Sequence, residues 1–311
     1  MRVDITRLQI LAAVNRHGSM AGAADELRYT SSAVSQQIRK LEAELHVALV
    51  ERHARGVRMT EAGCLVLGRA RAIEEQLEGL SGDLEQLAGG YTGTVRFGVF
   101  PTFAASLLPE VVIALRESHP GVRLAIHSSR ISPLRDLLET HQLDIALTWD
   151  YPWNRSPDTE LAVHELLLDS TVLIVPRTHR LARQNTIELT DMKDEEWIVR
   201  AAGHPTAELL FRCAHTAGFH PKVAIEASDY QETQAMIAAG LGVTLCPRLA
   251  TSYVREDVVV KRLEASMPAR RICAARLRDS KPTIASQRLE HILVNVVDDY
   301  TAALTRPARP D

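Results

Sequence analysis

Residues 18–41 read GSMAGAADELRYTSSAVSQQIRKL, and this stretch decides the fold of the N-terminal part of the chain. Gly18 is placed to end a preceding helix and Ser19 to cap the next one. The small side chains at positions 21–24 allow two helices to cross closely. Thr30 is a good N-cap for a third helix. The buried stripe of that helix consists of Val34, Ile38, Leu41 and Leu45.

The helix before Gly18 has an apolar face at helical spacing, formed by Ile5, Leu8, Leu11, Ala12 and Val14. In the third helix the exposed positions of the first turns carry short polar or basic side chains. They are Ser31, Ser32, Ser35, Gln36 and Arg39. A helix that enters the DNA major groove needs hydrogen-bonding groups of this kind near its N-terminus. The pattern predicts a helix-turn-helix.

A short basic segment, VERHARGVRMT at residues 50–60, follows the third helix. Arg55 and Gly56 suit a tight hairpin tip, with further basic residues beside it. The segment is either a solvated basic turn or a wing that follows the phosphate backbone or inserts an arginine into the minor groove. Its position directly after a helix-turn-helix favours the wing, with Arg55 and Arg58 on DNA.

The stretches 18–27 and 30–42, with Leu45, Leu49 and the run 60–63, closely resemble the DNA-binding domain of LysR-type transcriptional regulators. The resemblance implies that Ser31, Ser32, Ser35, Gln36 and Arg39 match recognition-helix positions, and that Arg55 and Arg58 match wing positions. Ser32 departs from the family, which often has proline there. Serine is also acceptable at this position, so we expect the fold to be kept.

Charge is unevenly distributed along the chain, although the net charge of the 311 residues is only −3. Residues 1–60 carry nine Lys or Arg and six Asp or Glu, whereas residues 61–90 carry two and six. A basic module joined to an acidic connector fits DNA contact by one end of the molecule.

The connector, residues 61–90, predicts a long helix capped by Thr60. Apolar side chains at alternating spacings of four and three give three heptads of a coiled-coil seam. They are Val66, Ala70, Ile73, Leu77, Leu80, Leu84 and Leu87. A lone amphipathic helix packed on its own domain is the alternative. The resemblance also implies a dimerising helix, and we expect Ile73, Leu77, Leu80, Leu84 and Leu87 at the dimer contact.

Beyond the glycine pair at 89–90, strand and helix patterns alternate, which predicts an α/β region with parallel or mixed sheets. The expected strands are 94–99, 122–127, 144–148, 171–175, 197–199, 223–226 and 243–246. Such folds bind ligands beyond the carboxyl ends of their strands.

Residues 93–304 resemble the two-lobed effector domain of LysR-type regulators, which is like a periplasmic solute-binding protein. The matching segments are 107–109, 119–122, 143–146, 175–182 and 238–247. The resemblance implies a first lobe of residues 93–163 and 270–304, a second lobe of residues 164–269, and an effector cleft between them. Residues 1–60 then form the winged helix-turn-helix domain, and residues 305–311 a disordered tail.

We expect the lining of the cleft at strand ends and helix starts. The candidates are Phe100, Pro101, Thr102, Ser128, Ser129, Arg130, Trp149, Asp150, Ala202, Gly203, His204, Thr206, Ser228, Asp229 and Tyr230. Each is alternatively an ordinary capping or surface residue. The cluster WDYPW at 149–153 is either an aromatic wall of the cleft or a packed crossover between lobes. Arg130 either pairs with a carboxylate effector or lies in solvent.

The chain shows no sequence pattern of a hydrolase, zinc protease or nucleotide-binding loop, so no catalytic site, metal or cofactor is expected. The four cysteines, Cys64, Cys213, Cys246 and Cys273, have no CxxC spacing. A thiol-based redox sensor of the same family is the alternative for the sensing step, with Cys213 and Cys246 in the second lobe. With no secretion signal or membrane span in the sequence, we expect a cytoplasmic homodimer or homotetramer. Its partners would be a near-palindromic operator in double-stranded DNA, a small-molecule effector and RNA polymerase.

Overall fold

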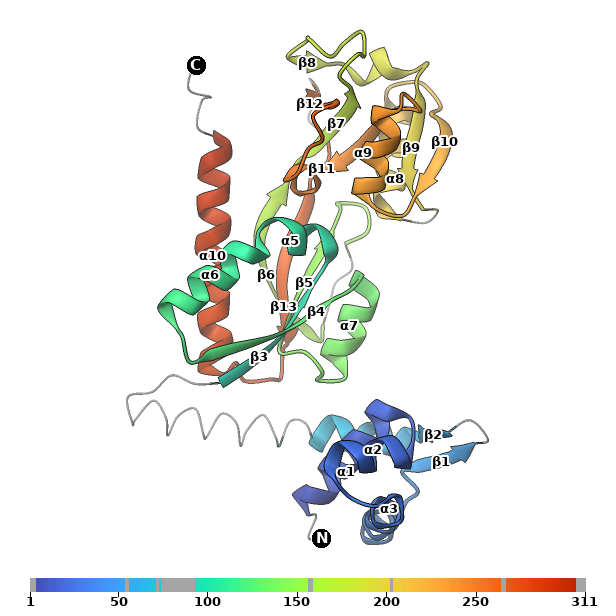
Figure 1. Cartoon of the computed structure of the whole chain (residues 1–311), viewed down its shortest axis with the longest axis vertical. Coiled ribbons are helices and arrows are strands. Elements are labelled where there is room, and N and C mark those ends of the chain that lie inside the picture. Colours follow the sequence, from blue (N-terminus) through green and yellow to red (C-terminus); the bar gives the residue numbers. More distant parts are fainter. Residues whose placement is uncertain are drawn as a thin grey trace.

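The computed structural model describes residues 4–53, 56–70, 73, 93–155, 159–201, 204–263 and 267–305. The N-terminal domain begins with three helices, which Figure 1 draws in blue. They are α1 (Ile5–His17), α2 (Met20–Leu27) and α3 (Ser31–Leu45). Gly18 ends α1 in the left-handed conformation, and the hydroxyls of Ser19 and Thr30 cap α2 and α3. The predicted helix-turn-helix is confirmed.

The wing is a two-stranded antiparallel hairpin of β1 (Val50–His53) and β2 (Gly56–Met59). It is tied to the turn between α1 and α2, because the Val57 N–H donates to the Gly18 carbonyl at 2.7 Å. Gly56 has a φ of +137°, and a Cβ there would lie 2.5 Å from the Gly18 oxygen. Only glycine fits this contact without strain. Ala54 and Arg55, at the predicted tip, lie outside the described residues.

A further helix follows the wing, capped by the Thr60 hydroxyl, which accepts the Gly63 N–H at 3.0 Å. Leu67 and Ala70 are buried in the core of the N-terminal domain, and Val66 packs against that core. Val66 and Ala70 therefore pack within their own domain, which corrects their assignment to the helix–helix seam. Ile73 is 44% exposed in the single chain.

The first lobe is built on a five-stranded sheet of order β4-β3-β5-β13-β6. Its strands are β3 (Gly93–Val99), β4 (Val122–Ser128), β5 (Ile145–Asp150), β6 (Leu161–Asp169) and β13 (Arg270–Leu277). The first three are parallel, and β13 runs antiparallel to both of its neighbours. The helices of this lobe are α5 (Pro101–Ser106), α6 (Leu108–Ser118), α7 (Ile131–Glu139) and α10 (Ile284–Thr305). Their apolar faces share one core with the sheet.

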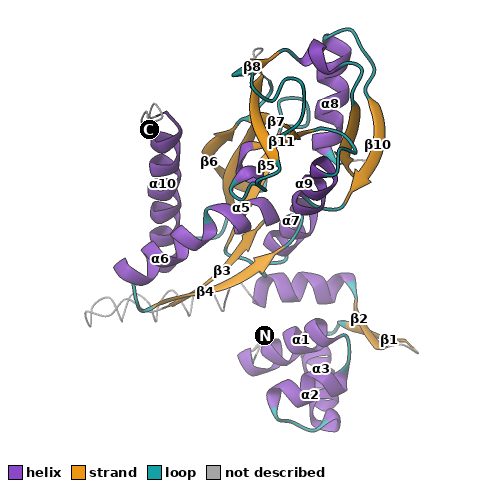
Figure 2. Ribbon diagram, turned by 45° about the horizontal axis from the view of Figure 1, so that its top comes forward, coloured by secondary structure: helices purple, strands orange, loops and turns teal. Residues whose placement is uncertain are grey.

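The second lobe contains a four-stranded sheet of order β11-β7-β12-β8 and a parallel pair of β9 and β10. The strands are β7 (Thr171–Pro176), β8 (Thr186–Ile187), β9 (Glu196–Arg200), β10 (Lys222–Ala227), β11 (Thr244–Pro247) and β12 (Val258–Leu263). The helical segments are η1 (Leu189–Met192), α8 (Pro205–Thr216), α9 (Tyr230–Ala238) and η2 (Arg248–Thr251). Figure 2 shows α8, α9 and β10 of this lobe close together.

The chain crosses between lobes at two places, which lie side by side. Strand β6 ends at Asp169 in the first sheet, and β7 begins at Thr171 in the second. The expected crossing near residue 164 is therefore wrong, since residues 164–169 pair with β13 in the first lobe. The return crossing precedes Arg270, as expected. All seven predicted strands are present, whereas β6, β8, β12 and β13 were not predicted.

Candidate functional site

The first candidate site is the exposed side of α3. Ser31, Ser32, Gln36 and Arg39 are exposed, as predicted. Ser32, Gln36 and Arg39 border one hollow of the surface together with Lys40. Ser35 is different: it is only 9% exposed and belongs to the buried side of the helix. The expectation that Ser35 is exposed is wrong, because it borders the buried stripe of Val34 and Ile38.

Arg39 is aligned along its own helix. Its Nε donates to the carbonyl oxygen of Ser35 at 3.3 Å. The contact holds the guanidinium close to the first turns of α3. On the wing, Arg58 is exposed on β2, and Arg55 lies outside the described residues. Of the predicted dimer positions only Ile73 is described; Leu77, Leu80, Leu84 and Leu87 lie outside.

The second candidate site lies between the two lobes, and its centre is Arg270, the first residue of β13. The Arg270 side chain is only 3% exposed. Its Nε donates to the Asp169 carboxylate at 2.8 Å, and its Nη2 donates to the Thr102 hydroxyl at 2.8 Å. The guanidinium also lies 5.0 Å from the Phe100 ring centroid and 5.4 Å from that of Trp149. One arginine thus joins both crossings to the start of α5.

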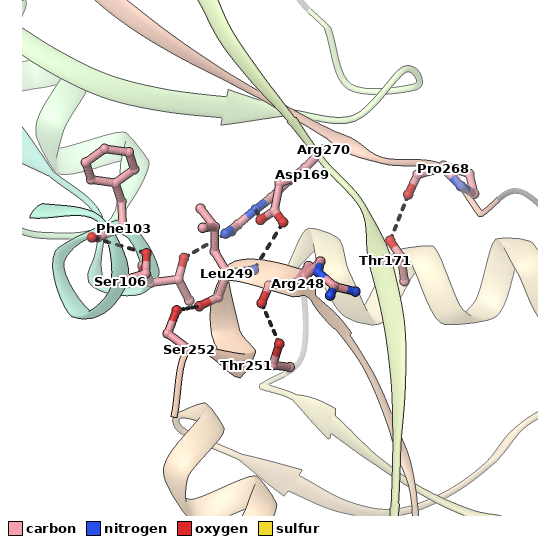
Figure 3. Close-up of polar contacts among 11 residues, drawn as sticks. Phe103, Ser106, Asp169, Thr171, Arg248, Leu249, Thr251, Ser252, Pro268 and Arg270 are labelled. Atoms are coloured by element: carbon pink, nitrogen blue, oxygen red, sulfur yellow. Dashed lines mark hydrogen bonds and ion pairs between the residues drawn. The ribbon is translucent and has the colours of Figure 1, made fainter. Parts of the chain in front are cut away.

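Asp169 has further partners, which Figure 3 shows. It accepts the Leu249 N–H at 3.1 Å, so that η2 of the second lobe is fixed to the crossing. Leu249 itself is buried in the core of the first lobe. The Thr171 hydroxyl donates to the Pro268 carbonyl at 2.8 Å, which gives a second bond between the crossings. The two crossings between the lobes are therefore tied together by hydrogen bonds and one ion pair, and we call this region the hinge.

Next to this hinge, hydroxyl groups from both lobes lie close to one another. Tyr151 follows β5 in the first lobe, whereas Thr206 lies in α8 and Tyr230 in α9 of the second. Within the described part of the chain, the three hydroxyl oxygens and the Nε of Arg200 are buried and make no hydrogen bond of normal geometry. Buried polar groups are normally paired, so such a set needs an explanation.

Burial sets the protonation of this group. Burial raises the pKa of Tyr230 to about 12 and raises the pKa of Tyr151 further, although the nearby Thr206 hydroxyl and the Arg270 charge act in the opposite direction. Both phenols therefore keep their protons at neutral pH and are available as donors. Arg200 lies over the Tyr230 ring, 5.1 Å from its centroid.

His204, a predicted lining residue, caps α8. Its Nδ1 accepts the Thr206 N–H at 3.2 Å, and its ring lies 5.7 Å from that of Trp149. Burial first, and then the charges of Arg200, Arg270 and Arg130, lower the pKa of His204 to about 4. The imidazole is neutral at physiological pH. The charges of three arginines therefore act on the His204 imidazole.

The other predicted lining residues divide into two groups. Phe100, Thr102, Trp149 and Thr206 belong to the cluster around Arg270 and the hydroxyls. Asp150 instead forms ion pairs with Arg271 at 2.6 Å and Arg155 at 3.1 Å.

The remaining positions lie at chain ends of elements. Ser128 ends β4, and Arg130 is the N-terminal flanking residue of α7; both are exposed, whereas Ser129 is half-buried. Ser228 and Asp229 are exposed and take part in capping α9, through Glu232. Pro101 begins α5, and Ala202 and Gly203 lie outside the described residues. Of these positions, Arg130 is connected to the cluster through its charge.

Sequence reasoning missed Arg200, Arg270 and Asp169. Each lies at a strand end, and a charged residue next to an apolar strand was the available signal. The side chains of the WDYPW cluster lie in two different environments. Trp149 faces Arg270 and His204, whereas the Tyr151 ring stacks on Trp153 at 4.7 Å between centroids and is fully buried.

Three of the four cysteines lie in surroundings that disfavour the thiolate form. Burial raises the pKa of Cys213 to about 11 and that of Cys273 to about 11, and raises the pKa of Cys246 more strongly. Cys213 packs against the core on one side of the second lobe, and Cys246 belongs to the core on the other. Cys64 is exposed.

Two features are absent from the described residues. No group of three or more histidine, cysteine, aspartate or glutamate side chains is arranged to hold a metal ion. No helix in this part of the chain has the length and apolar character needed to cross a membrane.

The geometry defines a class of protein: a winged helix-turn-helix joined to a two-lobed α/β domain. Two family models match the chain. Residues 5–64 match the bacterial regulatory helix-turn-helix protein of the lysR family, and residues 88–297 match the LysR substrate binding domain. The chain belongs to the LysR family and is a DNA-binding transcriptional regulator with an effector-binding domain.

Individual relatives agree with this membership. The chain is 28% identical to the transcriptional dual regulator GltC of Bacillus subtilis over 74% of its own length and 76% of GltC. It is also 28% identical to the hydrogen peroxide-inducible genes activator of Dickeya chrysanthemi, over 81% and 82% of the two chains.

Two solved structures share the fold. Full-length OxyR of Pseudomonas aeruginosa, in a variant form, superposes with a TM-score of 0.75 at 21% identity and covers 96% of this chain and 95% of its own. Full-length CbnR in complex with its target DNA has a TM-score of 0.58 at 23% identity, with 95% and 100% covered. At these identities the likeness concerns the fold alone.

Proposed function

We propose that this regulator binds a near-palindromic operator as a homodimer or homotetramer, with α3 in the major groove and the wing beside it. The exposed polar side of α3, with Ser31, Ser32, Gln36 and Arg39, supports this proposal. One half-site offers few base contacts, so two readers related by a two-fold axis are needed for specificity. Ile73, exposed in the single chain, begins the proposed dimer seam.

We further infer that a small-molecule effector binds between the lobes and controls DNA binding. One observation carries this inference: Tyr151, Thr206, Tyr230 and Arg200 bring buried polar atoms without partners to the junction of the lobes. An effector that satisfies them favours one arrangement of the lobes. The change of arrangement alters the spacing of the DNA-binding domains and the recruitment of RNA polymerase.

The coupling must be reciprocal, because an effector that changes DNA affinity is itself bound more or less tightly when DNA is present. In this proposal the protein acts in the cytoplasm, without a cofactor and without catalysing a reaction. The relatives named above are transcriptional regulators, which supports that role.

A footprint of the full chain on the DNA flanking its own gene tests the proposal, at fixed salt with competitor DNA. We expect a protected near-palindrome. A dimer that protects neither this DNA nor a genome-wide fragment library, with and without cellular metabolites, contradicts the proposal. A saturating effector that leaves affinity, footprint and bend unchanged contradicts the control step alone.

A redox-sensing regulator is the second candidate, because relatives at 28% identity include hydrogen peroxide-inducible activators. The raised pKa values of Cys213 and Cys246 disfavour it, since the thiolate is the reactive form. Thiol titration before and after peroxide treatment separates the two candidates. Loss of two thiols together with a changed footprint would favour the redox sensor.

A further inference from the structure

The unpaired polar atoms between the lobes are all available as donors, which restricts what can satisfy them. Tyr151 and Thr206 are 0% and 4% exposed, and the hydroxyl of Tyr230 is buried as well. A hydroxyl can donate or accept, whereas the Nε of Arg200 can only donate. A ligand group that accepts several hydrogen bonds at once would satisfy these atoms together.

The balance of charge around these donors is positive. The positive charges of Arg200, Arg130 and Arg270 all lower the pKa of His204. The Arg270 charge is balanced by the Asp169 carboxylate. Asp150, the other acidic residue of the predicted lining that belongs to the first lobe, is already held by Arg271 and Arg155. The place consequently carries an excess of positive charge, mainly from Arg200.

The N-terminus of α8 adds to this charge through its dipole. Its backbone groups add no free donors, because the N–H of Thr206 is bound by His204 Nδ1 and the N–H of Ala207 by the His204 carbonyl. Residue 205 is proline and has no N–H. The side chains of Thr206, Tyr151, Tyr230 and Arg200 are the donors that remain for a ligand.

Aromatic rings next to these donors form an apolar surface. Trp149 is partly exposed, with Arg270 and His204 over its ring. The rings of Tyr151 and Trp153 stack behind it. A ligand bound to the hydroxyls therefore meets the aromatic cluster with the rest of its body.

We propose that the effector is a small organic carboxylate, a statement that rests on the proposed function. Its carboxylate accepts hydrogen bonds from Arg200, Thr206 and the two phenols, and its apolar body packs near Trp149. A carboxylate provides two oxygens with about four acceptor positions in all, so it can accept from several of these donors at once. Arg200 supplies the opposite charge.

The test uses the full chain and a panel of defined probes at constant ionic strength. Acetate, hexanoate and benzoate are compared with hexanamide and benzamide, their neutral counterparts, and with inorganic phosphate. Binding is measured by calorimetry and by the shift of the melting temperature. We expect hexanoate or benzoate to bind at least about tenfold more tightly than its amide and than phosphate, the size expected for a charge-assisted hydrogen bond.

Variants locate the bound probe. Arg200→Gln should weaken the carboxylate by about tenfold or more, and Tyr230→Phe, which removes a single oxygen, by about fivefold. Arg180→Gln is the matched control, because Arg180 is an exposed arginine of the same lobe. It should leave binding unchanged. Far-ultraviolet circular dichroism checks that each variant is folded.

Several outcomes overturn the proposal: no carboxylate of the panel binds, the amides or phosphate bind equally well, or Arg180→Gln weakens binding as much as Arg200→Gln. The operator footprint is measured on the same preparations. A footprint without carboxylate binding overturns the effector class and leaves the regulator intact. Carboxylate binding without any footprint supports the effector class and contradicts the proposed operator binding.

Discussion

In the N-terminal domain the hydroxyls of Ser19, Thr30 and Thr60 each accept a backbone N–H at the start of a helix, whereas the hydroxyls of Tyr151 and Thr206 between the lobes make no hydrogen bond of normal geometry in the described structure. The first set lies within three residues of its partners. The second set comes from different lobes. The N-terminal domain thus satisfies these capping groups by hydrogen bonds within itself. At the junction of the lobes, polar groups are left without hydrogen bonds of normal geometry and are available to a ligand.

The largest expected effect concerns the hinge. Arg270→Met leaves the Asp169 carboxylate buried without its cation, and we expect a loss of about 3–5 kcal/mol of unfolding free energy. Denaturant unfolding followed by tryptophan fluorescence measures it, since all three tryptophans lie in the effector domain. The N-terminal domain should keep its helix content.

The matched control is the double variant Arg270→Met, Asp169→Leu, which removes the unpaired charge. It should recover part of the loss, because replacing a whole buried pair by apolar groups is often close to neutral. A single variant as stable as the parent would show that the hinge does not depend on this pair.

The second prediction concerns pH and separates the two regions. Because the pKa of folded His204 is lowered to about 4, the unfolded chain binds a proton that the folded chain does not between about pH 6.5 and 4. The stability contribution of His204 is therefore complete above pH 6.5 and is lost as the pH falls to 4. We expect about 1–3 kcal/mol over this range for the effector domain.

His204→Asn keeps a good helix cap and removes the titration, so it should flatten this pH dependence. In the N-terminal domain, Arg16 and then His17 lower the pKa of Glu26. Its contribution is present above about pH 4.5 and is lost only below it, by a few tenths of a kcal/mol, since the pair is half-exposed. An unchanged pH profile in His204→Asn would contradict the prediction.

The third prediction concerns the exposed surface of α3. Arg39→Ala should weaken binding to the specific operator by about 1–3 kcal/mol if Arg39 reads a base. Fluorescence anisotropy on operator and scrambled DNA measures the difference. An equal loss on both sequences would instead make Arg39 a phosphate contact. Stability should change little, because Arg39 is exposed.

The same contrast explains what the sequence could predict. The helix caps Ser19 and Thr30 act on groups three residues away, so local pattern was sufficient for the N-terminal domain. Ser35 was misjudged because it borders the buried stripe of α3, where a one-residue difference decides exposure. The seven predicted strands are runs of apolar residues with clear ends.

Long-range contacts were beyond that reasoning. Arg270 meets Asp169 across 101 positions and Thr102 across 168 positions. Strands β6 and β13, which carry Asp169 and Arg270, were not predicted, and β6 contains charged and polar residues that hide it. The resemblance to a family gave the two lobes, but not the residues that cross-link them.

The smallest expected effect is a pair of identical substitutions with opposite signs. Thr206→Val removes a buried hydroxyl that makes no hydrogen bond of normal geometry, so the ligand-free effector domain should gain about 1 kcal/mol of stability. Thr30→Val removes a helix cap, so the N-terminal domain should lose about 1 kcal/mol. Both exchanges keep a β-branched side chain of the same shape. Thermal unfolding of the two variants measures both signs. A loss of stability in Thr206→Val would mean that the Thr206 hydroxyl is hydrogen-bonded within the protein. One donor fewer would then be available to a ligand between the lobes.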